Sequence, residues 1–195
     1  MSAPRRVLAV AALAGLALAL PAVAGAGEPA SGSSGGGCRD ARLVPSKDNP
    51  ARVRAAVLCL LNAERTSRGL SQLHASAELR KAATAYSRNM VRKRFFAHVS
   101  PEGSTMLSRI KQGTNYLNRN VRDWALGENL GWGSGPKSTP QAMVRLWMAS
   151  AGHRDNILNE SFRHVGIGVA TGAPANIGGA RAATYTTDFG YRVTG

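Results

Sequence analysis

The chain has 195 residues and carries 25 lysines and arginines against 11 aspartates and glutamates, a formal net charge of +14. This length suits one domain with its own hydrophobic core. The apolar run from Val7 to Leu20 is shorter than the roughly 20 residues that a membrane-spanning helix needs, and no later segment approaches that length, so we expect no membrane span in the mature protein. The positive charge favours anionic partners such as cell-surface polymers, although a basic composition can also serve solubility alone.

The first 24 residues have the pattern of an export signal. Arg5 and Arg6 give a positive start, an apolar run follows, and Ala22-Val23-Ala24 supplies small residues for cleavage. We predict a signal peptide over 1–24, with cleavage after Ala24 or Ala26, and therefore a secreted, extracellular protein. Loss of the two arginines would leave a net charge of +12.

A glycine- and serine-rich linker is predicted over residues 25–37, because its composition cannot bury a core. The folded domain is predicted over 38–195. Cys38 and Cys59 are the only cysteines of the chain, and a pair of cysteines in an exported protein is more often bridged than free. We therefore predict a disulfide between them, with two free thiols as the alternative.

Helical periodicity dominates the first half of the domain. We predict one helix from Pro50 to Gly69 and a second that begins at Ser76, each with apolar residues at helical spacing. The opposite face of the second helix collects arginines and lysines, which we interpret as a solvated face. A short helix capped by Ser104 follows, and residues 113–123 show no clear period.

The second half of the domain predicts a glycine-rich segment, a helix and a pair of strands. Residues 124–135 are punctuated by glycines around Glu128 and are expected to end in a turn before Thr139. A third long helix is predicted over 140–150. Alternating runs at 165–169 and 184–189 predict two antiparallel strands joined by a long loop. Helices before strands favour an α+β domain over a parallel βαβ sheet.

Three polar clusters contain residue types that bind divalent metals or transfer protons. His98 lies in a loop bounded by proline and glycine, Glu128 follows a glycine, and His153 begins a helical turn. We expect the three to meet in space. The structural alternatives are that His98 stabilises its own loop, that His153 bonds a backbone carbonyl, and that Glu128 accepts backbone N–H groups.

Two common enzyme motifs are absent. The chain has no helical metalloprotease signature, with two histidines four residues apart and a glutamate between them. It also lacks the Gly-x-Ser-x-Gly turn of serine hydrolases, and neither cysteine has the setting of a free nucleophile.

Six motifs occur in order between about Val53 and Arg192. They are Leu61-Asn62-Ala63-Glu64-Arg65, Ala97-His98-Val99-Ser100-Pro101, Gly127-Glu128-Asn129-Leu130, the run from Trp147 to Leu158, Val165-Gly166-Ile167-Gly168 and Thr187-Asp188-Phe189-Gly190. Together they resemble the CAP superfamily, named for cysteine-rich secretory proteins, antigen 5 and plant pathogenesis-related 1 proteins, in its bacterial secreted form. The resemblance implies an α-β-α sandwich, with a small antiparallel sheet between helical layers and a concave surface cavity.

The cavity of that family commonly holds two histidines and two acids, and in some members it binds zinc. The resemblance implies that His98, Glu128 and His153 line the cavity here and are candidate zinc ligands. The position of the second acid is held by Ser150, which cannot replace the charge of a carboxylate. Ser100 lies beside the first histidine and is a further candidate cavity residue.

Two functions remain open from the sequence. The first is a secreted CAP-domain protein that binds a ligand, lipid-like or a divalent metal, in a cavity lined by two histidines and one glutamate. The alternative is a zinc-dependent extracellular hydrolase, a peptidase or a cell-wall degrading enzyme, in which Ser100 would orient the attacking water. No specific nucleic-acid partner is predicted, because the aromatic residues that stack on bases are few.

Overall fold

A computed structural model describes residues 37–195. The predicted signal peptide and all but the last residue of the predicted linker lie outside the described residues. The elements of the described part are α1 (Pro50–Thr66), β1 (His74–Ala75), α2 (Ala77–Lys93), α3 (Met106–Gly113), β2 (Val121–Ser134), the 3-10 helix η1 (Gly135–Ser138), α4 (Pro140–Ala149), α5 (Ala151–Leu158), β3 (His164–Thr171) and β4 (Ala182–Thr194).

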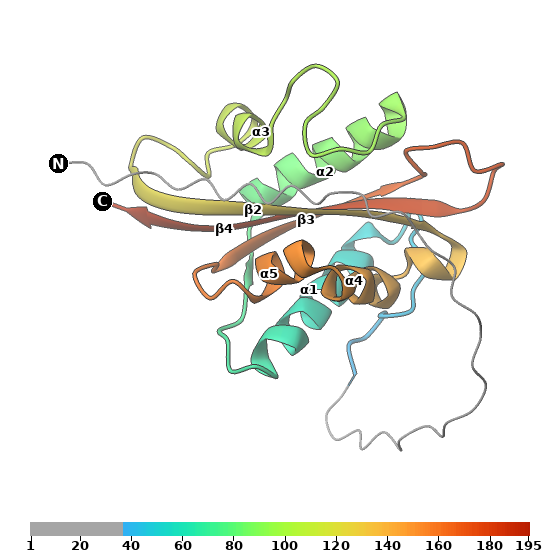
Figure 1. Cartoon of the computed structure of the whole chain (residues 1–195), viewed down its shortest axis with the longest axis horizontal. Coiled ribbons are helices and arrows are strands. Elements are labelled where there is room, and N and C mark those ends of the chain that lie inside the picture. The colour runs from blue at the N-terminus through green and yellow to red at the C-terminus, as the bar shows by residue number, and fades with distance from the viewer. Residues whose placement is uncertain (1–36) are drawn as a thin grey trace.

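The strands form one sheet in the order β1-β3-β4-β2. The short β1 pairs in parallel with β3, whereas β3 with β4 and β4 with β2 are antiparallel. Helices α2 and α3 cover one face of the sheet, and α1, α4 and α5 cover the other (Figure 1). The predicted α+β class and the α-β-α layering are confirmed, with a sheet that is mixed and larger than the expected hairpin.

Local signals set the helix boundaries. The α1 helix begins at Pro50, as predicted, and ends at Thr66, three residues before Gly69. Ser76 caps α2, and its hydroxyl accepts from the N–H of Leu79. The predicted cap of α3 was one residue early: the N-cap is Thr105, whose side chain accepts from the Ser108 N–H while the Ser108 hydroxyl accepts from the Thr105 N–H.

The glycine-rich segment 124–135 is mostly strand. Residues 124–134 lie in β2, the longest strand of the described part, and Gly135 begins η1. Its glycines let helices approach the sheet: a Cβ on Gly131 would stand 2.3 Å from the Met143 sulfur, and one on Gly127 would stand 2.7 Å from the side-chain oxygen of Asn156. The strand was not predicted, because glycine is more typical of turns, although in a strand it can also serve close packing. The turn expected before Thr139 corresponds to η1.

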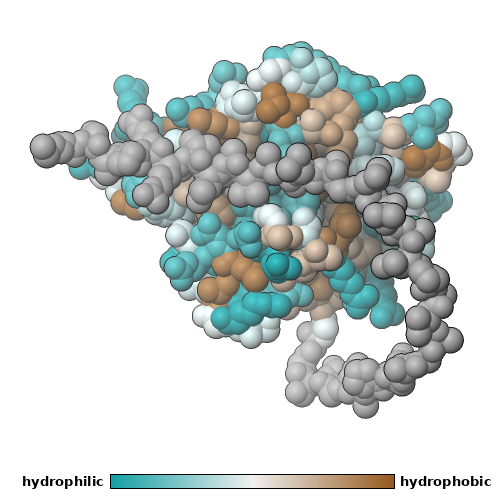
Figure 2. Space-filling model, in the orientation of Figure 1, coloured by the Kyte–Doolittle hydropathy of each residue, from teal (hydrophilic) through white to brown (hydrophobic). Residues whose placement is uncertain are grey.

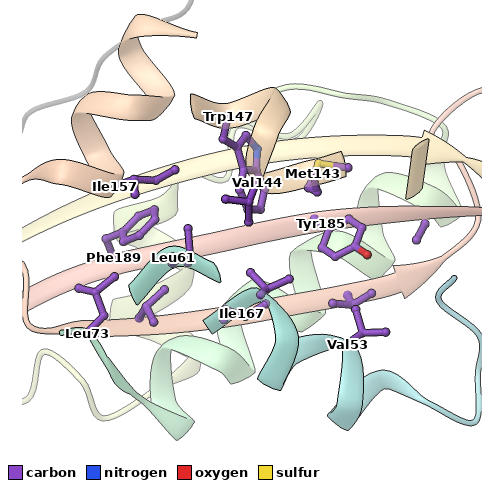
Figure 3. Packing of buried hydrophobic residues seen from close by; sticks show 14 of the residues in the cluster. Val53, Leu61, Leu73, Met143, Val144, Trp147, Ile157, Ile167, Tyr185 and Phe189 are labelled. Carbon is purple, nitrogen blue, oxygen red and sulfur yellow. The ribbon is translucent and has the colours of Figure 1, made fainter. Parts of the chain in front are cut away.

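The two faces of the sheet differ in chemistry. Toward α1, α4 and α5 lies the main hydrophobic core, in which Trp147, Tyr185 and Phe189 are fully buried (Figure 3). Toward α2 the middle of β3 presents two glycines. A Cβ on Gly166 would lie 2.1 Å from the Leu79 backbone, and one on Gly168 would lie 2.2 Å from that of Ala83. Helix α2 therefore packs directly on the backbone of β3.

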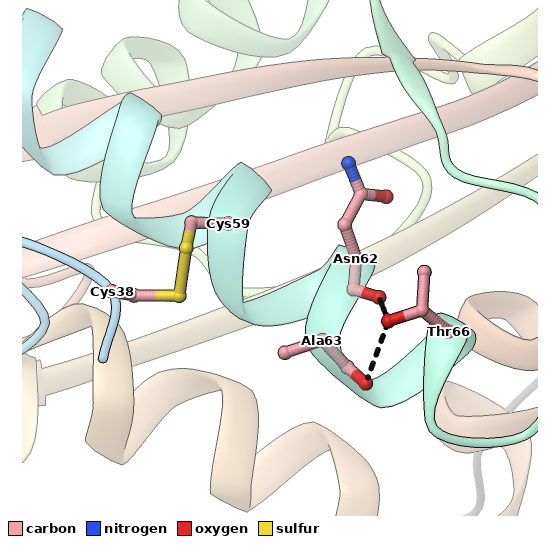
Figure 4. Close-up of a disulfide and its surroundings, with 5 residues drawn as sticks. All are labelled: Cys38, Cys59, Asn62, Ala63 and Thr66. Atoms are coloured by element: carbon pink, nitrogen blue, oxygen red, sulfur yellow. Dashed lines mark hydrogen bonds between the residues drawn. A yellow bond between two sulfur atoms is a disulfide. The ribbon is translucent and has the colours of Figure 1, made fainter. Parts of the chain in front are cut away.

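A disulfide and a buried arginine fix α1. The predicted bond between Cys38 and Cys59 is present and joins the segment before α1 to the helix itself (Figure 4). Arg65 is fully buried and donates to the carbonyl oxygens of Ile157, Asn159, Phe162 and Ser71. These bonds attach the end of α1 to the end of α5, and so hold α5 in place.

The visible surface is mostly hydrophilic, with hydrophobic residues in several separate areas (Figure 2). Within residues 37–195, none of the helices has the length and apolar character needed to cross a membrane.

Candidate functional site

The candidate site lies at one edge of the sheet, around β2. Glu128 stands in the middle of this edge strand, and its side chain is 3% exposed. The loop after α2 brings the Nδ1 atom of His98 to 2.8 Å from Oε1 of Glu128. Helix α5, which carries His153, lies against the same strand from the other side. The three predicted residues thus gather around β2.

The loop of His98 is held by neighbouring backbone and side-chain groups. Helix α2 ends at Lys93, and its C-cap residue Arg94 is in the left-handed region with φ of 55°. The Tyr86 hydroxyl donates to the carbonyl of Ala97 at 2.6 Å. Ser100 is buried, and its hydroxyl accepts from the N–H of Ser104 at 3.1 Å. This contact gives Ser100 a role in the shape of the loop.

Arg109 was not predicted as a site residue; it lies in α3 and forms an ion pair with Oε2 of Glu128. Its guanidinium also donates to the carbonyls of His98 at 3.2 Å and Ser104 at 2.9 Å, and it stacks 3.3 Å from the centre of the Tyr86 ring. Burial raises the pKa of Tyr86 to about 12, with Arg109 acting in the opposite direction. Both carboxylate oxygens of Glu128 are therefore engaged by neighbouring protein groups.

Asp188 is the second residue of the site that was not predicted from the sequence. It lies directly opposite Glu128 in the β2–β4 register and is 1% exposed. Neither of its oxygens has a geometric hydrogen-bond partner among the described residues. Burial, and then the negative charge of Glu128, raises the pKa of Asp188 well above its ordinary range. A protonated Asp188 can donate to Glu128, which avoids two negative charges side by side.

The strand alternation contained a signal for Asp188. It shares a face of β4 with Thr184 and Thr186, whereas Tyr185 and Phe189 face the hydrophobic core. A carboxyl on the polar face of a buried central strand needs a neighbour that can share a proton with it, and its register neighbour on β2 is Glu128.

His153 is positioned through two asparagines. The Asn129 side chain donates to the His153 carbonyl at 2.9 Å, and Asn156 donates to the side-chain oxygen of Asn129 and to the carbonyl of Glu128. The His153 Nδ1 atom is buried and has no hydrogen-bond partner among the described residues. Burial, and then the nearby His98, lowers the pKa of His153. The imidazole is therefore neutral at neutral pH.

Ser150 is the N-cap residue of α5, and its side chain makes no capping hydrogen bond. Its backbone N–H donates to the Trp147 carbonyl and its own carbonyl accepts from Arg154, so it joins α4 to α5. The structure thus gives Ser150 a place in the helix junction. The second acid near Glu128 is Asp188, from a different part of the chain.

These groups do not present a ligand set for zinc in this arrangement. Within residues 37–195, no group of three or more histidine, cysteine, aspartate or glutamate side chains is placed to hold a metal ion. The Arg109 guanidinium also occupies the carboxylate oxygen that a cation would need, and a divalent ion there would face its positive charge. We therefore derive no chemical step through a metal.

A hollow of about 500 Å³ lies between α2 and α3, beside the site. Arg109, Tyr86 and Ser104 line it together with Lys81 and Lys93, whereas His98, Glu128 and His153 do not. The arrangement as a whole can accept and donate hydrogen bonds. It offers no free carboxylate base, because Glu128 is already paired on both oxygens.

Comparisons with known proteins agree with this fold. The family model for the cysteine-rich secretory protein family, CAP, matches residues 58–180. The protein YkwD of Bacillus subtilis is 39% identical over 113 residues, which are 57% of this chain and 40% of that protein. The membrane protein YlbC of the same organism is 30% identical over 115 residues, 58% of this chain and 30% of its own length. The chain thus covers less than half the length of these relatives.

Two solved structures share the fold. An extracellular protein of Bacillus anthracis that contains an SCP domain has a TM-score of 0.53 at 24% identity, over 72% of this chain and 43% of that one. An outer surface protein of Borrelia burgdorferi has a TM-score of 0.58 at 18% identity, over 75% and 96%. With the family model covering most of the folded part, the chain belongs to the cysteine-rich secretory protein (CAP) family.

Proposed function

We propose that this CAP protein is exported and acts by binding a largely apolar, lipid-like ligand at the β2 edge, beside His98 and His153, without chemistry of its own. The observation that carries the proposal is a pair of exposed apolar side chains in the loop of His98. Phe96 is 45% exposed and Val99 is 49% exposed. Apolar side chains that flank a buried polar cluster are typical of ligand sites.

The electrostatics of the site support an uncharged ligand. The negative charge of Glu128 is balanced by Arg109, and the lowered pKa of His153 keeps that imidazole neutral. A ligand there would meet hydrogen-bonding groups whose charges are already compensated. Because both oxygens of Glu128 are paired, it has no free role as a general base, which favours binding over hydrolysis.

Export is supported by three observations. The first residues have the pattern of a signal peptide, and the domain contains a disulfide, which is typical of oxidising compartments. The structural neighbours include an extracellular protein and an outer surface protein. A basic exterior would also favour contact with anionic cell-surface polymers.

The test is a titration of the mature protein with a fluorescent fatty acid, together with mass spectrometry of lipids extracted from the secreted protein. Phe96→Ser and Val99→Ser should each weaken binding by about tenfold, from the loss of partly buried apolar surface. Leu146→Ser is the matched control, since Leu146 is 53% exposed on α4, away from the loop. Absence of binding, or an equal loss in the control, would contradict the proposal.

The zinc-dependent hydrolase remains a separate prediction. Calorimetric titration of zinc into the metal-stripped domain tests it, with the His98→Ala/His153→Ala variant alongside. Micromolar binding to the wild type and none to the variant would require Arg109 to leave Glu128, and would revive the hydrolase. The geometry described above predicts no such binding.

A further inference from the structure

A groove runs along the opposite edge of the sheet from the histidines. Its walls are α1 and α2, and β3 forms the floor at its two ends. Three hollows of about 440, 490 and 270 Å³ line up along it. Arg54, Ala77 and Arg80 line both the first and the second, and Arg88 lines both the second and the third. The three hollows therefore form one continuous groove.

The floor of the groove is an unpaired strand edge. Strand β1 pairs with β3 only as far as Val165, whose carbonyl accepts from the N–H of Ser76. The chain then enters α2, so beyond Val165 no described strand lies on that side of β3. The Gly172 N–H donates to the carbonyl of Ala182 on β4. Along an antiparallel strand, every second residue directs its N–H and C=O toward the same neighbouring strand. The even-numbered residues of β3 therefore bond to β4.

It follows that the N–H and C=O groups of Ile167 and Val169 point into the groove. Ile167 lines the first hollow and Val169 lines the third. Among the described residues, no hydrogen bond joins this side of either residue to another group. Strand edges of this kind are templates for pairing with another extended chain.

The walls of the groove carry positive charge without compensation. Lys47, Arg54, Arg80, Arg88 and Arg92 line the three hollows, and no acidic residue does. None of the ion pairs between described residues includes Arg54, Arg80 or Arg88. Burial, and then the charge of Arg80, lowers the pKa of Arg54. An anionic partner would offset the repulsion among these neighbouring positive charges.

We propose that the groove binds an extended acidic peptide segment of another protein, which adds to the sheet as a strand beside β3. The main-chain groups of Ile167 and Val169 pair with the peptide backbone, and the arginines on the walls bind its carboxylates. A second copy of this chain fits poorly, because it would bring one basic groove against another. This site is separate from the histidine cluster and goes beyond the function proposed above.

The test uses the mature protein and a blocked hexapeptide of alternating glutamate and valine, labelled for fluorescence anisotropy. Two isomers carry N-methyl groups on one or the other set of alternate residues, so their mass and charge are equal. Only one set of N–H groups can face β3. We expect one isomer to bind about tenfold more weakly than the other, from lost backbone hydrogen bonds, and the parent peptide to slow amide exchange at Ile167 and Val169.

Matched charge variants complete the test. Arg54→Gln/Arg80→Gln should weaken peptide binding about tenfold more than Arg119→Gln/Arg181→Gln, which removes the same charge from exposed positions elsewhere. Inorganic polyphosphate represents the other class of polyanion. The proposal is wrong if the peptide does not bind, if the two isomers bind equally, or if both double variants lose the same amount of peptide affinity. It is also wrong if polyphosphate competes with the peptide while N-methylation has no effect on binding.

Discussion

Replacement of Arg109 by glutamine tests the physical basis of the site. The substitution removes the cation from Glu128, whose side chain is 3% exposed, and removes two backbone contacts and the stack on Tyr86. Breaking a buried ion pair from one side costs about 3–5 kcal/mol, because the remaining charge is left buried without compensation. A domain of ordinary stability would stay largely folded after such a loss.

The assay is urea denaturation at pH 7, with Arg68→Gln as the control. Arg68, in the turn after α1, pairs with Glu64 of that helix, and the two side chains are 46% and 35% exposed. Its loss should lower the free energy of unfolding by less than about 1 kcal/mol. The double variant Arg109→Gln/Glu128→Gln should be more stable than the sum of the two single losses predicts. A loss below about 1 kcal/mol for Arg109→Gln, or simple additivity in the double variant, would refute this reasoning.

Three further predictions concern the frame around the site. Cys38→Ser/Cys59→Ser opens a loop with a sequence separation of 21 and should lower the free energy of unfolding by about 3 kcal/mol, measured by denaturation under non-reducing conditions. Gly168→Ala should lower the free energy of unfolding by about 1–3 kcal/mol, because the added methyl group conflicts with α2. Gly113→Ala, whose methyl group would meet nothing within 4 Å, should lower it much less. Equal losses in the two variants would contradict the packing argument. Burial lowers the pKa of His153 and His164 from 6.5, so the unfolded chain binds protons that the folded chain does not, and stability should fall as the pH drops from 6.5. Denaturation at pH 5 and 7 measures this slope, which His153→Gln or His164→Gln should reduce.

Local patterns were sufficient to predict much of the fold. The helices that became α1, α2 and α4 follow from apolar spacing and from the proline or serine at their starts, and β3 and β4 follow from alternation. Residues 124–135 were not predicted as a strand. Their glycines alone indicate interruptions of regular structure, and only the close approach of Met143 and Asn156 shows why the strand needs glycine there.

The site was predictable where a motif marked it and unpredictable where distant residues meet. His98 and Glu128 were expected to lie together, and Nδ1 of His98 is 2.8 Å from Oε1 of Glu128. Arg109 lies in a short helix whose sequence says nothing about which carboxylate it will reach. Alternation along β4 places Asp188 on the polar face, but its position opposite Glu128 depends on the β2–β4 register, which neither strand specifies alone.

The position of Glu128 on an edge strand also determines how often the site is disrupted by local opening of the sheet. Strand β2 pairs with β4 on one side only, and the contacts to His98 and to the helix of His153 both meet on it. A transient separation of β2 from β4 would therefore disperse the whole cluster while the β3–β4 pair remained intact. Local opening of this strand, observable as amide exchange from Gly127 to Leu130, limits the lifetime of any bound state, and a ligand held there should slow that exchange.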